Sequence, residues 1–376
     1  MKLFLQRHST ERFRGKLVIA IASASLVFFG AGCSASSTPS TGPDAGVWKS
    51  TDGGLTWVQK KAYVAGAKVT SAIANIAVSA LEFDPQDHAT LYLGSSDSGL
   101  LFTRDAGESW RQEKNADPVK SAVTSGNIRS VAVHPKNRCT VYAASGNKIY
   151  KTETCAVEWT QVYSDPRTDN SFTRLSLDWY NPNNLYAGTT DGDVLKSENG
   201  GLSWKKLNRV AGVPISQIIV DRTDSRVIYV GTQGEGLLKS VDSGVTWESI
   251  KAQFGNELKD LRRVTELVQD PVDAKTLYIV SSKYGVGKSE DGGETWKGLN
   301  LTTPPGSVKL YTMAIDPKNN KKLFLAGVKT FQISSDGGNT WTVKKLPTTQ
   351  AGGVLRIDPM DSNSIYLGTV PPPQTQ

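Results

Sequence analysis

Short apolar runs recur along the chain, and each is bounded by Gly, Asp, Asn or Pro. Runs rich in β-branched and aromatic residues between such breakers are typical of β-strands. A second strand-like unit follows the apolar run, and its copies are Leu91-Tyr92-Leu93-Gly94, Val141-Tyr142-Ala143-Ala144, Leu185-Tyr186-Ala187-Gly188, Ile228-Tyr229-Val230-Gly231, Leu277-Tyr278-Ile279-Val280, Leu323-Phe324-Leu325-Ala326 and Ile365-Tyr366-Leu367-Gly368. The hydrophobic pattern therefore predicts an all-β chain built from repeated strand pairs.

An eight-residue polar pattern, Ser/Thr-x-Asp-x-Gly-x-Thr/Ser-Trp, separates these pairs, and we call it the box. Its copies are residues 50–57, 103–110, 152–159, 197–204, 240–247, 289–296 and 334–341. Asp and hydroxyl side chains bond backbone N–H groups in turns, and Gly permits positive φ. We therefore expect a structural turn at each box, held by Asp52, Asp105, Asn199, Asp242, Asp291 and Asp336. The box Trp begins the next strand and is expected to pack between neighbouring sheets.

Successive box Trp residues are 43 to 53 residues apart, which predicts a repeat architecture. The first box has no strand pair before it, and the last strand pair has no box after it. We therefore predict a seven-bladed β-propeller of four-stranded antiparallel blades over residues 45–370, closed by N-terminal outer strands that pair with C-terminal inner strands. Glu82 and Arg356 occupy equivalent positions beside this join. They are candidates for an ion pair across it, and chance opposition at solvated ends is the alternative.

The boxes resemble the Asp-box (BNR) repeat of sialidase-like and sortilin-like β-propellers, over residues 46–370. In that family the repeat is a turn between the two outer strands, away from the binding face. The resemblance therefore implies a fold, and it does not imply that the box Asp residues are catalytic or bind Ca²⁺. The chain is also similar to the lipoprotein-type photosystem II assembly factors and to single-propeller relatives of xyloglucanases. These resemblances imply two classes of function, an assembly scaffold and a glycoside hydrolase.

Residues 1–33 have the organisation of an export signal, with a positive start, an apolar stretch over residues 17–29 and small residues before Cys33. This run resembles a bacterial lipobox, with Cys33 as the lipidated first residue of the mature chain. An ordinary cleaved signal and an uncleaved anchor are the alternatives. Residues 34–44 read as a flexible Ser/Thr/Pro/Gly linker, and residues 371–376 as a Pro-rich tail. We therefore expect an extracytoplasmic protein of the bacterial cell envelope, lipid-anchored to a membrane.

Charge and cysteine content agree with export. Removal of residues 1–32 takes away five Lys/Arg and one Glu, so the net charge falls from +7 to +3, too small to argue for a nucleic-acid partner.

Cys139 and Cys155 remain as a pair in an oxidising compartment. Cys155 lies in the one broken box, where Thr154 and Ala156 replace Asp and Gly. We expect a disulfide across the inner hairpin of that blade, in place of the lost turn network; two free buried thiols are the alternative.

A candidate site follows from the resemblance, because the innermost strand of a propeller blade begins at the face that binds ligands. The predicted rim of the central opening comprises Arg129, Arg174, Gln217, Arg263, Glu266 and Tyr311. Converging Arg residues and one carboxylate suit an anionic group, such as a sugar acid or an acidic protein side chain. A hydrated rim without a ligand is the alternative. Within the long segment 248–266, Phe254, Leu258 and Leu261 have helical spacing and predict a short amphipathic helix over this face.

Other chemistry has little support in the sequence. No His/Cys cluster has metal-ligand spacing, no nucleophile elbow is present, and the Gly pairs belong to turns rather than phosphate loops. We therefore assign no catalytic residue, metal or cofactor. The favoured function is a non-catalytic binding or assembly scaffold with a protein or carbohydrate partner on the propeller face. The alternative is a glycoside hydrolase, sialidase-like or xyloglucanase-like, although the Arg-Ile-Pro stretch of sialidases is missing and one propeller is expected.

Overall fold

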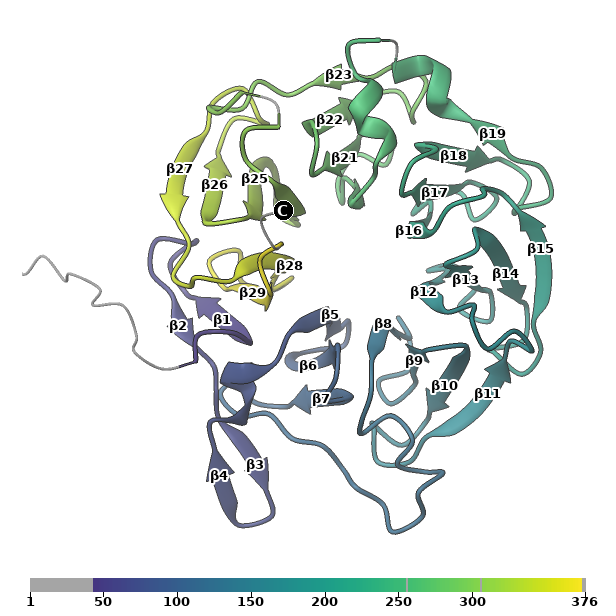
Figure 1. Ribbon diagram of the computed structural model, residues 1–376, viewed down its shortest axis with the longest axis vertical. Helices are drawn as coiled ribbons and strands as arrows, with labels where there is room; N and C mark the ends of the chain where they lie inside the picture. Colours follow the sequence, from purple (N-terminus) through teal and green to yellow (C-terminus); the bar gives the residue numbers. More distant parts are fainter. Residues whose placement is uncertain (1–42, 255, 305, 374–376) are drawn as a thin grey trace, which may run out of the picture. The chain divides into compact units, whose positions relative to one another are not determined.

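The computed structural model describes residues 43–254, 256–304 and 306–373, which form a ring of seven antiparallel sheets, the blades, around a central opening (Figure 1). The predicted export signal, Cys33, linker residues 34–42 and tail residues 374–376 lie outside these residues. Within them, no helix is long and apolar enough to cross a membrane. The predicted all-β, seven-bladed propeller is confirmed.

The two inner strands of each blade are the repeated apolar pairs. The innermost strands of blades 1 to 7 are β5 (Val78–Asp84), β8 (Ile128–Val133), β12 (Phe172–Leu177), β16 (Ile215–Val220), β20 (Glu266–Gln269), β24 (Leu310–Asp316) and β28 (Ala351–Ile357). The second strands are β6 (Asp87–Ser95), β9 (Val141–Ser145), β13 (Leu185–Thr189), β17 (Ile228–Thr232), β21 (Leu277–Ser281), β25 (Asn319–Gly327) and β29 (Ile365–Val370). The second strands are buried on both faces, which explains their continuous rather than alternating hydrophobicity.

The two outer strands of each blade flank a box. The third strands are β7 (Leu100–Thr103), β10 (Lys148–Thr152), β14 (Asp193–Ser197), β18 (Leu237–Ser240), β22 (Gly285–Ser289), β26 (Thr330–Ser334) and β1 (Val47–Ser50). The outermost strands, in blades 2 to 7, are β11 (Thr160–Ser164), β15 (Lys205–Arg209), β19 (Glu248–Ser249), β23 (Lys297–Gly298), β27 (Thr342–Lys345) and β2 (Val58–Gln59). In blade 1 the fourth position is reduced to a bridge between Phe102 and Arg111, beside the hairpin of β3 (Tyr63–Ala65) and β4 (Lys68–Thr70).

The part of the chain that the structure describes has three short 3-10 helices between blades, η1 (Ala72–Asn75), η2 (Ile250–Phe254) and η3 (Lys259–Arg262). The amphipathic helix predicted within 248–266 was therefore wrong in type, because η2 and η3 are two separate turns. Gly255, between them in the sequence, carries one of the highest costs for helix formation. Phe254, Leu258 and Leu261 are nevertheless buried together, so the spacing identified a local core.

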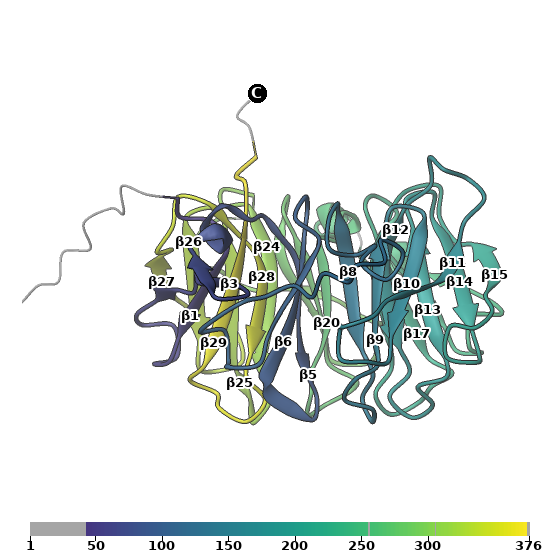
Figure 2. The same cartoon turned by 90° about the horizontal axis from the view of Figure 1, so that it is seen from below.

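The ring has two unlike faces. The turns that join first to second strands and the seven boxes lie on one face, which we call the box face, and the connections between blades lie on the other, the loop face (Figure 2). In every blade a backbone N–H of the box donates to the carbonyl two residues before the repeated Leu-Tyr-Leu-Gly-like unit, as Gly53 does to Asn363. The inner and outer turns of each blade are thus tied together on the box face.

Closure follows the predicted route. Strand β1 lies between β2 and β29, with Val47 opposite Gly368 and Ser50 opposite Ile365. The chain's two ends therefore share blade 7. Asp44, in the segment predicted to be a linker, accepts hydrogen bonds from the Thr349 backbone N–H (2.6 Å) and from the Gln350 side chain, so this residue is tied to blade 7.

Apolar cores lie between neighbouring blades rather than within them. Each cluster joins the second strand of one blade to the first strand and box Trp of the next, as Tyr142 joins Leu175 and Trp204. The buried Tyr also bonds the next box, because the hydroxyls of Tyr142 and Tyr229 donate to carbonyls of Gly200 and Gly292. Close packing across each seam therefore sets the order and tilt of the blades.

The boxes are turns held by their own side chains. In the fifth blade Ser289 Oγ accepts the Gly293 N–H (2.8 Å), and Asp291 accepts the backbone N–H and hydroxyl of Thr295. The same bonds recur at Asp52, Asp242 and Asp336. At Asn199 the amide oxygen accepts the Ser203 backbone N–H, and the amide nitrogen donates to the Ser203 hydroxyl. These carboxylates are committed to their own turns.

A ring of side-chain bonds, which we call latches, joins neighbouring blades on the box face. In five seams, the Asp at or directly after the end of the innermost strand is hydrogen-bonded to a side chain of the next blade. The pairs are Asp178–Ser225, Asp221–Gln269, Asp270–Asn320, Asp316–Ser362 and Asp358–His88. Blade 2 departs from this pattern on both sides. Asp84 Oδ2 has no hydrogen-bond partner among the described residues, and His134 stands where the next Asp would be. The sequence pattern showed the Asp-Pro turns but not their partners.

The disulfide joins Cys139 and Cys155, whose Cα atoms are 4.0 Å apart, within blade 2. We expected this disulfide to cross the inner hairpin of the blade. It instead connects the turn of that hairpin to the broken box. The bond reinforces the place where Cys155 N–H donates to the Cys139 carbonyl. The broken box also keeps more of its turn hydrogen bonds than expected, because Thr154 Oγ1 still accepts the Glu158 N–H (2.8 Å).

Candidate functional site

A cavity of about 560 Å³ occupies the centre of the ring. The innermost strands supply an apolar wall that includes Val131, Leu175, Ile219, Val268 and Ala314. Side chains alternate along a strand, so alternate residues face the centre while the others pack into the blade seams. The cavity has the volume of a small-molecule or peptide side-chain site and a wall suited to apolar groups.

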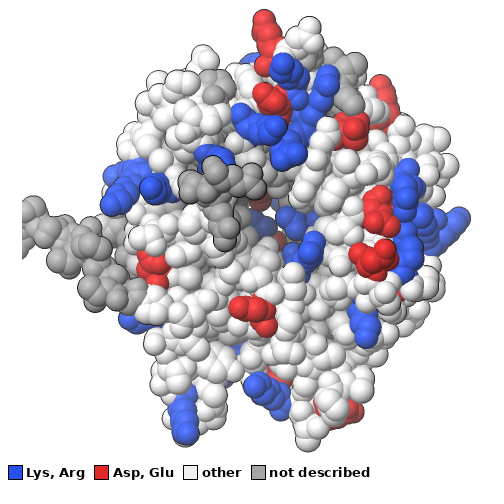
Figure 3. All heavy atoms as spheres, viewed as in Figure 1, with Lys and Arg blue, Asp and Glu red and all other residues white. Residues whose placement is uncertain are grey.

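A polar cluster closes the cavity on the side nearer the loop face. Arg356 bonds Glu82 across the closing seam, with Nη2 2.6 Å from Oε1, which confirms the predicted pair. Arg356 Nη1 also lies 3.7 Å from Glu266 Oε1 of blade 5, and the second Glu266 oxygen accepts the Met313 N–H at 2.7 Å. One Arg therefore lies between two carboxylates. Figure 3 shows both basic and acidic side chains inside the central opening.

The electrostatics of this cluster are coupled. Burial raises the pKa of Glu266, although Arg356 stabilises its carboxylate. Burial lowers the pKa of Arg174, where Glu266 opposes the shift and Arg356 reinforces it. For Arg356, Glu82 and Glu266 together outweigh burial and raise the pKa. The Arg residues therefore remain cationic near neutral pH, held in place by two carboxylates.

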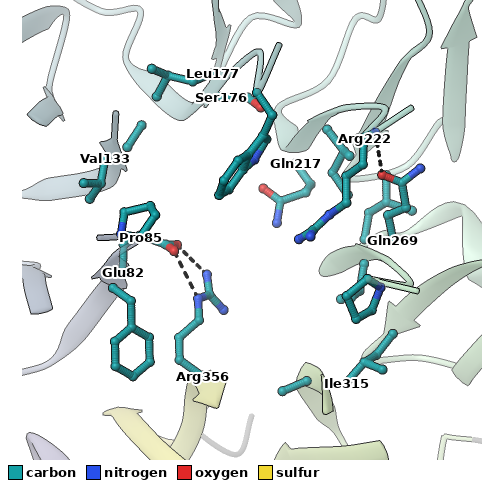
Figure 4. A pocket seen from close by; sticks show the side chains of 18 of the residues that line it. Glu82, Pro85, Val133, Ser176, Leu177, Gln217, Arg222, Gln269, Ile315 and Arg356 are labelled. Carbon is teal, nitrogen blue, oxygen red and sulfur yellow. Dashed lines mark hydrogen bonds and ion pairs between the residues drawn. The ribbon is translucent and has the colours of Figure 1, made fainter. Parts of the chain in front are cut away.

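The other end of the cavity reaches the box face, where the residue after each latch position forms a mouth. Five blades place Pro there, at Pro85, Pro135, Pro271, Pro317 and Pro359. Blades 3 and 4 instead place Trp179 and Arg222, with the Arg222 guanidinium carbon 5.9 Å from the indole centroid. Figure 4 shows Gln217 and Arg222 projecting into the cavity opposite Glu82 and Arg356.

The six predicted rim residues differ in their position relative to the cavity. Gln217 and Glu266 line the cavity. The charges of Glu266, Glu82 and Arg129 all influence the pKa of Arg174. Arg129 and Arg174 therefore lie within electrostatic range of the cluster. Tyr311 is half-buried in β24, and Arg263 is exposed in the connection before β20, where it bridges Gln233. Their role in binding stays a prediction.

Sequence reasoning missed the box-face mouth. It treated that side as structural because the boxes are there, and it had no reason to compare the residue after each latch position. The signal was present, since Trp179 and Arg222 interrupt an otherwise repeated Pro. Among the described residues no group of three His, Cys, Asp or Glu side chains is arranged to hold a metal ion.

Comparison with known sequences gives one distant relative. No family model matches the chain. The oligoxyloglucan reducing-end-specific xyloglucanase of Emericella nidulans is 25% identical over 213 residues, which are 45% of this chain and 25% of that protein. The chain thus spans about a quarter of the length of the curated relative it matches.

Comparison with solved structures shows the same fold in proteins with different roles. The GH74 xyloglucanase from Xanthomonas campestris has a TM-score of 0.63 and 16% identity, over 78% of this chain and 51% of that chain. The extracellular domain of BT4673 from B. thetaiotaomicron has a TM-score of 0.60 and 18% identity, over 82% and 38%. YCF48 bound to D1 peptide has a TM-score of 0.58 and 17% identity, over 78% and 94%. At these identities the likeness establishes the fold alone.

Proposed function

We propose that this protein is an extracytoplasmic, membrane-anchored binding or assembly scaffold that holds a protein partner on its propeller and catalyses no reaction. The observation that carries the proposal is the central cavity, whose wall is apolar and whose two carboxylates are both engaged by Arg356. An apolar cavity with a few fixed polar groups at one end is a binding site in its own right.

The arrangement of the carboxylates argues against hydrolysis. Glycoside hydrolases place one carboxylic acid and one carboxylate on opposite sides of the scissile bond. Here the Arg356 guanidinium lies between Glu82 and Glu266, and Glu266 also accepts a backbone N–H. Neither carboxylate is available to transfer a proton to a substrate unless this cluster comes apart.

The comparisons and the export signal support the remaining parts. YCF48, whose full length is nearly matched by this chain, was solved with a D1 peptide, so a single propeller of this size can hold a polypeptide. The BT4673 domain is extracellular, in keeping with export. The lipid anchor at Cys33 is inferred from its sequence context. We propose no nucleic-acid partner and no cofactor.

The proposal is tested by in-cell photo-crosslinking with the full chain. A crosslinkable residue is placed at exposed positions on each face, and crosslinked proteins are identified by mass spectrometry. The Cys33→Ser variant is the control for the anchor, because it should leave the membrane fraction while it keeps its fold. A chain that forms no protein adduct from either face would contradict the scaffold proposal.

A glycoside hydrolase remains the second candidate, because the curated relative and one structural neighbour are xyloglucanases. Incubation of the purified chain with xyloglucan oligosaccharides tests it, with Glu266→Gln as the matched variant. We expect no reducing sugar above background. Turnover that is lost in Glu266→Gln would favour the hydrolase.

A further inference from the structure

Exposed apolar side chains gather on the box face. Of the thirteen large hydrophobic residues that are exposed among the described residues, nine lie in its turns. They are Leu55, Val157, Trp179, Tyr180, Leu202, Val241, Val245, Val272 and Met360. Five of the nine lie in the outer box turns, whereas Trp179, Tyr180, Val272 and Met360 lie in the inner turns beside the cavity mouth. Scattered exposed apolar residues are ordinary, but their concentration on one face is typical of an interaction surface.

The cavity mouth is specialised at one point of its circumference. Trp179 is 47% exposed and Tyr180 is 63% exposed, and both follow the Asp178 latch. Pro and Trp rings around the mouth offer flat, rigid apolar contacts that lose little entropy on binding. The face therefore offers an apolar rim with a preorganised entrance, on the side opposite to the predicted site.

Arg222 is the cation of this mouth. Its backbone N–H donates to Gln269 Oε1, and Gln269 in turn bonds Asp221, so the turn that carries Arg222 is fixed by the neighbouring blade. Among the described residues no carboxylate lies within ion-pair distance of its guanidinium. The surrounding atoms lower its pKa by desolvation, with Asp270 opposing. Arg226 provides a contrast in the same turn, since it pairs with Asp224 at 2.7 Å.

We infer that the partner docks on the box face and inserts a peptide segment in which an acidic side chain lies among apolar residues, with its carboxylate on Arg222 and its apolar neighbours against Trp179 and the Pro rim. The inference rests on the proposed function and specifies its site. Charge complementarity decides the occupant, because the Arg222 guanidinium at the mouth and the Gln217 amide in the cavity have no acceptor among the described residues. A purely apolar occupant would leave these donors unpaired.

A peptide array provides the direct test. The full chain is incubated with synthetic peptides of about ten residues that carry one Glu flanked by Pro, Leu or Phe, each beside its counterpart with Gln, and affinities are measured by fluorescence anisotropy. We expect the Glu peptides to bind about tenfold more tightly than their Gln counterparts, as for a charge-assisted pair. Equal binding of the two series, or binding of neither, would overturn the inference.

Two matched variants locate the carboxylate. Arg222→Gln keeps the backbone bond to Gln269 and should abolish the preference for Glu, whereas Arg226→Gln, in the same turn, should leave it intact. Trp179→Ala should weaken both peptide series, with the preference for Glu retained. A preference that survives in Arg222→Gln, or that disappears equally in Arg226→Gln, would contradict the assignment.

Crosslinking separates failure of this inference from failure of the proposed function. A crosslinker at Tyr180 or Met360 reports on the box face, and one at Lys283, in the turn between β21 and β22, reports on the loop face. The inference expects adducts of one protein from the box face, whose contacting segment carries Asp or Glu among apolar residues. Protein adducts from the loop face alone would overturn the inference and leave the scaffold. Lipid adducts or dimers of this chain from the box face would overturn it in favour of those occupants.

Discussion

Two regions of the ring depart from the repeat, the closing seam between blades 7 and 1 and the whole of blade 2, and they are reinforced in different ways. Blade 7 is built from both ends of the chain, and its strands β28 and β29 are joined to β1 and β2 by strand pairing without a covalent connection. The Glu82–Arg356 pair and the His88–Asp358 latch tie its C-terminal strands to blade 1. Blade 2 lacks the box Asp, the box Gly and a latch Asp, and a disulfide joins its two turns. The incomplete turns of blade 2 are thus offset by a disulfide within that blade. The two ends of the chain are instead joined by strand pairing and by charged side chains.

Removal of the crosslink is expected to have the largest effect. The bond closes a loop with a sequence separation of 16, so the double variant Cys139→Ser/Cys155→Ser should lose about 3 kcal/mol of unfolding free energy in the chain-entropy model. Urea titration followed by Trp fluorescence measures the change. A loss no larger than that of Thr154→Ala alone would show that the remaining turn bonds suffice.

Removal of Arg356 tests the closing seam. Arg356→Ala leaves two half-buried carboxylates without their cation, and we expect a loss of about 2 kcal/mol, below the range for fully buried pairs because solvent screens part of the charge. Arg226→Ala breaks an exposed pair on the box face and should cost much less, because solvent screens exposed charges. Equal losses in the two variants would mean that the Glu82–Arg356 pair adds nothing to the β1–β29 pairing in closing the ring.

Box hydroxyls should differ between an intact blade and blade 2. Ser289→Ala removes the acceptor of the buried Gly293 N–H and should cost about 1 to 2 kcal/mol. Thr152→Val, the equivalent change in blade 2, removes bonds to Thr154 alone and should cost about 0.5 kcal/mol. Chemical denaturation of both variants measures the contrast, and equal costs would contradict it.

Acid should weaken the boxes that carry Asp and leave the boxes of blades 2 and 3, which carry Thr154 and Asn199 instead, unaffected. The Thr246 hydroxyl and backbone N–H lower the pKa of Asp242 to about 2, and Thr340 does the same for Asp336. Because an unfolded Asp titrates near 4, this stabilisation is complete above about pH 4 and is lost as the pH falls towards 2. Asp242→Asn should therefore flatten the fall of Tm between these values, and a parallel fall would contradict the assignment. Thr154 has no carboxyl group and cannot contribute.

The sequence predicted the fold more fully than the site, for physical reasons. Box spacing and unmatched half-blades determine the number of sheets and their closure, and the repeat register placed Glu82 opposite Arg356. The η2 and η3 turns escaped prediction because periodicity does not distinguish one helix from two turns whose apolar residues share a core. The latches and the cavity mouth depend on contacts between blades some 50 residues apart, such as Asp270–Asn320, which no local pattern reveals.

Because β1 pairs with β29 and the Thr369 N–H donates to the Gly46 carbonyl, the first and last strands of the ring are neighbours. The starting point of the gene is thus structurally arbitrary, and a circular permutant with the old ends fused and a new break between two other blades should fold to the same ring. Its weakest join would then lie wherever the new break falls, which offers a way to relocate the point at which the molecule first opens.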